Sequence, residues 1–161
     1  MATPSEPQAY AANTKAFFER LGSSNPISDA ADRLRFFSDL LRSLLKADLV
    51  ETGRIICSFV VNPALTNLYN TLHGGAVASV AEVLAVACAK SVAGDIELFT
   101  GETATSYLSA ARVNEEVEVE GRVLRKGRRV IVTEVNLRIK KTGRMLYTNR
   151  STFYVMPLAK L

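Results

Sequence analysis

Hydrophobic and polar residues alternate through four segments in the second half of the chain, at 97–108, 115–124, 130–140 and 144–155. Alternation with a period of two is typical of strands that bury one face. A further segment, 54–61, is rich in β-branched residues and is predicted to be a strand as well. Glycine-containing turns join the last three segments, which predicts an antiparallel meander.

Helical spacing of apolar residues predicts a short helix at 15–21 and an amphipathic helix over about 29–45. Residues 74–89 form a different kind of helix, apolar on every side except for Ser79 and Glu82. Such a helix must be covered on most of its surface. It is too short and too charged to cross a bilayer, so we expect no membrane span. The whole pattern predicts an α+β fold in which an antiparallel sheet surrounds one long helix.

Composition excludes several classes of protein. With 161 residues, 48% hydrophobic and 22% charged, the chain has the size and composition of one folded domain rather than of a disordered or fibrous protein. Its two cysteines, Cys57 and Cys88, lie in apolar segments without metal-binding spacing, so we expect reduced core thiols. His73 is the single histidine, which argues against a zinc site, and we predict that no metal is bound.

Positive charge is concentrated in one part of the chain. The net charge is +4, and ten of the 20 basic residues fall between positions 122 and 150, against one acidic residue, Glu134. Some of these residues suit exposed strands and turns, but the cluster at one predicted turn indicates an anionic partner. The cluster consists of Arg125, Lys126, Arg128 and Arg129. No aromatic residues are interleaved with it, so we do not expect nucleic-acid binding.

The start of the apolar helix carries the candidate chemistry. If Gly74 and Gly75 open the helix, their N–H groups and the positive end of the helix dipole are ready for an anion or a developing oxyanion. Glu82 shares a helix face with Gly75 and Ser79, and a carboxylate in apolar surroundings is costly unless it is paired or functional. It lies about 10 Å along the axis from the helix start, and a dimer could bring Glu82 and the helix start together. His73 is either a helix cap or a functional imidazole.

Taken together, residues 67–82 resemble the signature of hotdog-fold acyl-CoA thioesterases of the phenylacetate-pathway and acyl-CoA thioesterase 13 type, in the 4-hydroxybenzoyl-CoA thioesterase superfamily. The shared pattern is an Asn, then His-Gly-Gly, then an acidic residue nine positions after the His. The resemblance implies a hotdog thioesterase domain at 47–157, a partly helical N-terminal extension at 1–46 and a C-terminal tail at 158–161. It also implies hydrolysis of an acyl-CoA thioester to a free acid and coenzyme A.

The same resemblance implies roles for single residues. Glu82 would be the general base, or else the nucleophile, and the Gly74 N–H would polarise the thioester oxygen. Asn67 and His73 would orient the water, the thioester or the loop that holds them, and Thr100 would help to position the water. The residues implied to bind coenzyme A are Gly75, Arg125, Lys126, Arg128 and Arg129. Coenzyme A belongs to the substrate, and no separate cofactor is implied.

Partners and alternatives follow from the same resemblance. Such thioesterases are homodimers or homotetramers, and the open edges of a single sheet favour an oligomer here. The acyl group stays open between aromatic and fatty acyl chains. Two other interpretations of these residues are a non-catalytic acyl-CoA-binding hotdog module and an enoyl-CoA hydratase-type enzyme.

The two ends of the chain bear on localisation. The first residues lack the basic and apolar regions of a secretory signal. The last three, Ala159-Lys160-Leu161, differ by one substitution from the Ser-Lys-Leu peroxisomal address. We therefore expect the protein in the peroxisome, with the cytosol as the alternative.

Overall fold

The structure, a computed structural model, describes residues 6–20, 26 and 29–156. The chain divides into two compact units, Met1–Ser38 and Asp39–Leu161. The first unit contains helix α1 (Glu6–Arg20) and a 3-10 helix, Asp29–Asp32. The helix expected to begin at residue 15 is therefore present but starts at Glu6, and residues 10–20 are exposed.

The helix expected over 29–45 is broken, so the prediction of one continuous helix is wrong. Arg35 has a φ of 65°, in the left-handed region that a right-handed helix does not tolerate. The second piece, α2 (Phe36–Leu44), is amphipathic. It buries Leu41, and Leu40 and Leu44 pack against the core of the second unit.

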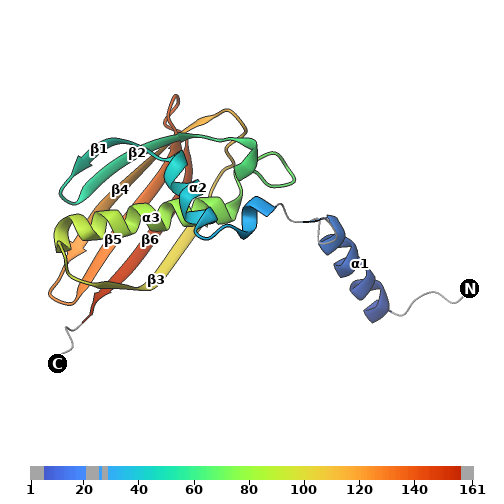
Figure 1. Ribbon diagram of the computed structural model, residues 1–161, viewed down its shortest axis with the longest axis horizontal. Coiled ribbons are helices and arrows are strands. Elements are labelled where there is room, and N and C mark those ends of the chain that lie inside the picture. The colour runs from blue at the N-terminus through green and yellow to red at the C-terminus, as the bar shows by residue number, and fades with distance from the viewer. Residues whose placement is uncertain (1–5, 21–25, 27–28, 157–161) are drawn as a thin grey trace, which may run out of the picture. The chain divides into compact units, whose positions relative to one another are not determined.

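Six antiparallel strands form one sheet in the order β1-β2-β4-β5-β6-β3. Their bounds are β1 Lys46–Glu51, β2 Arg54–Val60, β3 Leu98–Tyr107, β4 Glu116–Lys126, β5 Val130–Ile139 and β6 Met145–Val155. Strands β2 to β6 match the five predicted segments, and the meander of β4, β5 and β6 is confirmed. Strands β1 and β3 form the two edges of the sheet (Figure 1).

Strand β1 has no counterpart in the prediction. It is an edge strand whose side chains are exposed except for the half-buried Leu49, so it shows no alternation of polar and apolar positions. It reaches β2 through a two-residue hairpin in which Gly53 has a φ of +77°. Hairpin turns of this kind favour glycine because other residues rarely adopt a positive φ.

Helix α3 (Gly74–Ala93) lies across one face of the sheet, as the apolar run at 74–89 predicts (Figure 1). Its buried residues pack mainly over β2, β4, β5 and β6. They are Ala76, Val77, Val80, Ala81, Leu84, Ala85, Cys88 and Ala89. The helix comes so near to β4 that a Cβ atom added to Gly121 would lie 2.7 Å from the Cys88 Sγ atom. The long central helix and the antiparallel sheet around it confirm the expected α+β hotdog architecture.

The opposite face of α3 is open in the single chain, contrary to the expectation of a helix covered on most sides. Gly75, Glu82 and Lys90 are exposed, and the Val83 side chain is 42% exposed. By length and composition alone, α3 would be long and apolar enough to cross a membrane, a test that core helices also pass. Its packing against the sheet makes it the core helix of this fold.

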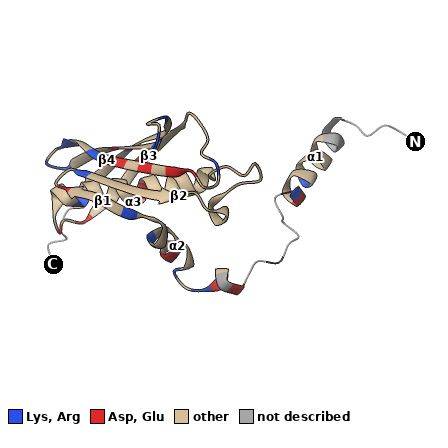
Figure 2. Cartoon of the chain, turned by 90° about the horizontal axis from the view of Figure 1, so that it is seen from above, with Lys and Arg blue, Asp and Glu red and all other residues tan. Residues whose placement is uncertain are grey.

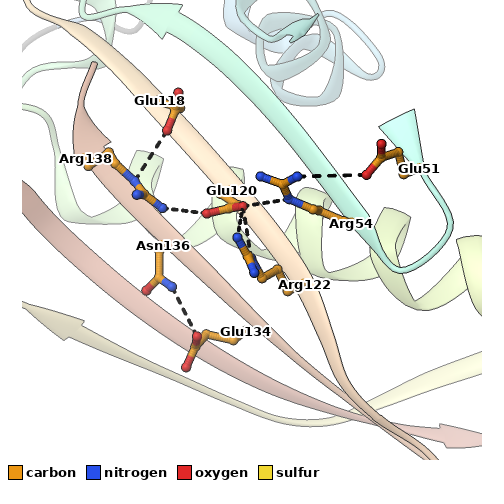
Figure 3. A network of polar contacts seen from close by, with 8 residues as sticks. All are labelled: Glu51, Arg54, Glu118, Glu120, Arg122, Glu134, Asn136 and Arg138. Carbon is orange, nitrogen blue, oxygen red and sulfur yellow. Dashed lines mark hydrogen bonds and ion pairs between the residues drawn. The ribbon is translucent and has the colours of Figure 1, made fainter. Parts of the chain in front are cut away.

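The sheet face away from α3 carries a network of ion pairs centred on Glu120 (Figure 3). The carboxylate, 8% exposed, accepts hydrogen bonds from Arg54 at 2.9 Å, Arg122 at 2.6 Å and Arg138 at 2.6 Å. Burial by itself would raise the pKa of Glu120, but the hydrogen bonds and charges of the arginines outweigh it and lower that pKa. Cross-strand pairing thus ties β2, β4 and β5 together on this face.

Candidate active site

The loop before α3 is organised by the side chain of Asn67. Its Oδ1 atom accepts hydrogen bonds from the Tyr69 N–H at 2.9 Å, the Thr71 N–H at 3.3 Å and the Thr71 hydroxyl at 3.1 Å. The main chain closes the same loop, because the Asn67 N–H donates to the Thr71 carbonyl at 2.9 Å. Asn67 therefore holds the loop, which is one of the roles expected for it. Its Nδ2 group has no partner among the described residues.

His73 is the N-cap of α3. Its Nδ1 atom accepts a hydrogen bond from the Gly75 N–H at 2.9 Å, so a neutral imidazole carries its proton on Nε2. The His73 N–H in turn donates to the Leu65 carbonyl at 2.7 Å, which anchors the cap to the preceding loop. The Gly75 N–H, which the resemblance implies for coenzyme A binding, is thus engaged with His73 within the chain.

Gly74 is the first residue of α3, and among the described residues its N–H has no acceptor. The ring of Tyr107, at the end of β3, packs on this glycine: an added Cβ atom would lie 3.2 Å from Tyr107 Cε1. The Tyr107 hydroxyl donates to the Gly74 carbonyl at 3.2 Å. A free N–H at the positive end of a helix dipole is suited to an oxyanion. The sequence did not point to Tyr107. Its part in the site is seen only in its contact with Gly74.

Glu82 shares a helix face with Gly75 and Ser79, as expected, but it is exposed rather than buried. The sheet covers only the other side of α3, and so the apolar neighbours of Glu82 in the sequence do not surround it in space. Ser79 donates to the Gly75 carbonyl at 2.9 Å. Glu82 lies seven residues, about 10 Å, beyond Gly75 along the helix axis. In one chain, therefore, its carboxylate does not reach a group bound at the Gly74 N–H.

Thr100 lies near the other end of β3. Its cross-strand partner is the buried Phe153, so Thr100 faces the helix side of the sheet. A bulge follows at Gly101, where the ring of Tyr154 covers the backbone so closely that an added Cβ atom would lie 2.1 Å from it. Seven residues separate Thr100 from Tyr107, a distance of about 23 Å along a strand. One chain does not bring Thr100 to the helix start.

The structure divides the basic residues of positions 122–150 into paired and unpaired ones. Five form ion pairs with acidic residues. These are Arg122, Arg138, Lys140, Arg144 and Arg150. Lys126 donates to the Val92 carbonyl at the end of α3. Arg125, Arg128 and Arg129 have no side-chain partner in the described part of the chain, which leaves three of the four predicted anion-binding cations free.

Arg128 and Arg129 line a cavity of about 930 Å³ at the end of the sheet where β3 begins. Tyr154 and the two acidic residues Asp95 and Glu97 also line it. Figure 2 shows basic residues at this end of β4 and acidic residues along its middle. The cavity lies at the end of β3 that carries Thr100. Gly74 contacts Tyr107 at the other end of that strand.

No group of three or more His, Cys, Asp or Glu residues that could hold a metal ion is present in the described ranges. Cys57 and Cys88 are free and buried, as expected for core thiols. Burial raises the pKa of both thiols, and that of Cys88 reaches about 11.

An antiparallel sheet wrapped on one long helix, with a glycine at the helix start, defines a hotdog-fold protein. A model of the thioesterase superfamily matches residues 69–154. Human acyl-coenzyme A thioesterase 13 is 31% identical over 116 residues, which cover 69% of this chain and 81% of that protein. The chain belongs to the thioesterase superfamily and is a thioester hydrolase.

Two solved structures share the fold. Zebrafish thioesterase superfamily member 2 has a TM-score of 0.70 and 23% identity, over 73% of this chain and 86% of that chain. A hypothetical thioesterase from Streptococcus pneumoniae, solved with coenzyme A, has a TM-score of 0.66 and 18% identity, over 71% and 87%. At these identities the likeness concerns the fold alone.

Proposed function

We propose that the protein is an acyl-CoA thioesterase, which hydrolyses an acyl-CoA thioester to a free acid and coenzyme A. The observation that carries the proposal is the free Gly74 N–H at the start of α3, held in place by the His73 cap and the Tyr107 contact. The name of the human relative and the coenzyme A in the Streptococcus pneumoniae structure support the choice of substrate class.

In the proposed reaction, the Gly74 N–H binds the thioester oxygen as it gains negative charge. Glu82 acts as the general base: it takes a proton from water while the water oxygen bonds to the thioester carbon. The C–S bond then breaks, and the coenzyme A thiolate leaves and takes up a proton. In the alternative, the Glu82 carboxylate attacks the same carbon and the coenzyme A thiolate leaves. Water then hydrolyses the mixed anhydride, which releases the acid and restores Glu82. The His73 Nε2–H and the Asn67 amide are free to orient the thioester or the water.

We further propose that two copies of the chain complete each site. Strand β3 is a ten-residue edge strand with one free side. Antiparallel pairing of β3 with its own copy reverses direction and sets the Thr100 end of one copy beside the Tyr107 end of the other. The open face of α3 with Glu82 and Val83 is a second surface for the partner to cover. A homodimer, or a homotetramer built from two of them, follows.

Three arginines without a side-chain partner among the described residues are proposed to hold the phosphates of coenzyme A, with Lys126 beside them: Arg128 and Arg129 of the β4–β5 turn and Arg125 at the end of β4. Because the β3–β3 pairing carries this turn toward the helix start of the partner, one copy would supply the cations and the other the Gly74 N–H. Arg128→Ala with Arg129→Ala should raise KM and weaken its dependence on salt, with kcat nearly unchanged.

Replacement of Glu82 tests the catalytic assignment. Glu82→Gln and Glu82→Ala should lower kcat by a factor of about 10² to 10⁴ on a panel of aromatic and aliphatic acyl-CoA esters, with unchanged circular dichroism. Glu19→Gln, an exposed glutamate on α1, is the matched control and should keep full activity. Full activity in Glu82→Gln would contradict the assignment. Binding of the panel without turnover by the wild type would favour a non-catalytic acyl-CoA-binding module, and hydration of enoyl-CoA would favour a hydratase.

The oligomeric state is measured by light scattering during size-exclusion chromatography. A particle of at least twice the chain mass of 17.5 kDa is expected. A monomer that is fully active would contradict the composite site, because one chain separates Glu82 and Thr100 from Gly74.

We also propose that the protein is peroxisomal, with the cytosol as the alternative. The supporting residues, Ala159-Lys160-Leu161, lie outside the described part of the chain. A fluorescent protein fused to the N-terminus should give a punctate peroxisomal pattern that is lost when Leu161 is deleted. A diffuse signal in both cases would favour the cytosol.

A further inference from the structure

Polar side chains line the helix side of three neighbouring strands, β3, β5 and β6, and on β5 and β6 they occupy core positions. Thr133 on β5 and Asn149 and Ser151 on β6 are 0%, 1% and 2% exposed. In the strand register, Ser151 stands beside Thr133 on one side and Thr103 of β3 on the other. The next residues along these strands on this face include Ile131, Val135, Leu137 and Phe153, which are apolar and buried. A polar group in such a place costs free energy unless it is hydrogen-bonded.

Three of the side chains close a ring of hydrogen bonds. Asn149 Nδ2 donates to Thr103 Oγ1 at 2.9 Å, and Ser151 donates to Asn149 Oδ1 at 3.0 Å. The single hydroxyl proton of Ser151 is thereby used, so the 3.0 Å contact between Thr103 and Ser151 must have Thr103 as its donor. Every proton in this ring has an acceptor.

The second proton of the Asn149 amide leaves the ring and reaches Thr105, whose Oγ1 atom accepts it at 2.8 Å. The Thr105 hydroxyl is thus oriented as an acceptor toward the core, and its own proton has no acceptor among the described residues. Thr105 is half-buried and lies on the open edge strand β3. At the buried end of the row, the Thr133 hydroxyl also has no partner in the described chain. Among the described residues, therefore, the Thr105 proton and the Thr133 hydroxyl remain without a hydrogen-bond partner.

Thr105 lies near the candidate oxyanion site. It precedes Tyr107 by two residues, about 7 Å along the strand, and residues two apart face the same side of a sheet. Tyr107 packs directly on Gly74, the first residue of α3. A substrate that is bound at the Gly74 N–H and extends along β3 past Tyr107 would therefore meet the Thr105 hydroxyl.

We propose that Thr105 is a substrate-binding residue that donates a hydrogen bond to an acceptor oxygen of the thioester substrate, and that Asn149 and Ser151 position it. The inference rests on the proposed acyl-CoA thioesterase function. An acceptor oxygen can come from a substituent on the acyl chain or from an amide of the pantetheine arm. In either case the donor is partly preorganised, because the hydrogen bond from the Asn149 amide turns the Thr105 proton away from Asn149.

The test compares two esters that differ by one hydroxyl group, octanoyl-CoA and 3-hydroxyoctanoyl-CoA, in the full-length protein. Thr105→Val removes the hydroxyl and keeps the shape, and it should raise KM about fivefold to tenfold with little change in kcat. Thr105→Ser restores the hydroxyl and should recover most of the loss. The matched control is Ser106→Ala on the opposite face of the same strand, which should leave KM unchanged.

The outcomes distinguish the two sources of the acceptor oxygen. They also distinguish a failure of the Thr105 inference from a failure of the proposed thioesterase function. An equal rise in KM for both esters places the acceptor on the pantetheine arm, and a rise only for the hydroxylated ester places it on the acyl chain. Unchanged KM for both esters in a folded Thr105→Val protein would overturn the inference while leaving the thioesterase intact. If the wild type hydrolyses neither these esters nor any other member of the acyl-CoA panel, the proposed function fails. Equal Kd values of wild type and Thr105→Val for both esters would then overturn the inference as well.

Discussion

Helix α3 approaches the sheet closely at Gly121 of β4. An alanine at this position should lower the free energy of unfolding, and a second substitution should reverse the sign of that change. A Cβ atom at Gly121 would lie 2.7 Å from Cys88 Sγ, about 1 Å nearer than a comfortable contact, while the nearest Leu84 atoms would be at 3.5 Å. Cys88 is fully buried, so relief requires a shift of the helix or the strand. Overpacking of this kind costs about 1–3 kcal/mol.

A second effect of Gly121→Ala opposes the clash. Replacing a glycine inside a strand stabilises the fold by about 0.5–1 kcal/mol, because the unfolded chain loses freedom. The φ of Gly121 is not positive, so alanine fits the backbone. The net expectation is a loss of about 1–2 kcal/mol in the free energy of unfolding. With a urea m-value of about 2 kcal/mol/M, the unfolding midpoint should fall by about 0.5–1 M.

In a Cys88→Ala background the clashing sulfur is gone, and Gly121→Ala should become neutral or stabilising by about 0.5–1 kcal/mol. The double-mutant cycle should therefore show a coupling of about 2 kcal/mol between the two sites. The assay is urea unfolding followed by circular dichroism at one fixed protein concentration, since oligomers unfold in a concentration-dependent way. Equal destabilisation by Gly121→Ala in both backgrounds would refute the close approach of α3 to β4.

Two further predictions concern titratable groups. The pKa of Glu120 in the folded protein is lower than its usual value of 4.5, so ionised Glu120 stabilises the fold at pH values above 4.5. This stabilisation is lost as the pH falls through the folded-state pKa. Because its arginine partners are partly exposed, Glu120→Gln should cost about 1–2 kcal/mol at pH 7, and its unfolding midpoint should vary less between pH 5 and 3 than that of the wild type; parallel pH profiles would contradict this. The buried Cys57 and Cys88, with raised pKa values, should resist a thiol reagent at pH 8 and yield two thiols per chain in denaturant; rapid labelling of the folded protein would show that α3 opens.

Five strands and the central helix follow from the sequence because their signal is local. Apolar and polar residues alternate from Glu134 to Lys140, and β5 buries every second residue along its length. Strand β1 escapes the same reasoning because it lies at an edge and buries almost nothing. The break at Arg35 escapes it too, since arginine is an ordinary helix former and nothing in its neighbourhood announces a positive φ.

The sequence could suggest residues for the candidate site, but it could not show how exposed they are or which contacts they make. The spacing of Gly75, Ser79 and Glu82 places them on one helix face, and the structure agrees. The exposure of Glu82 could not follow from its apolar neighbours, because exposure depends on which elements cover the helix. The resemblance already implied the Gly74 N–H as the oxyanion donor, and the structure adds that the His73 cap occupies the neighbouring Gly75 N–H.

By itself, then, the sequence determined the order and period of the elements, the glycine start of the long helix and the excess of positive charge between positions 122 and 150. Only the tertiary structure decided which cations are paired with distant carboxylates, that Tyr107 meets Gly74, and that Asn149 orients Thr105 from a strand more than forty residues away. Periodicity follows from the backbone geometry of a single helix or strand, which is local in the chain. Burial, ion pairing and the orientation of a hydroxyl group depend on contacts between residues that the fold brings together. Such contacts leave no local pattern in the sequence.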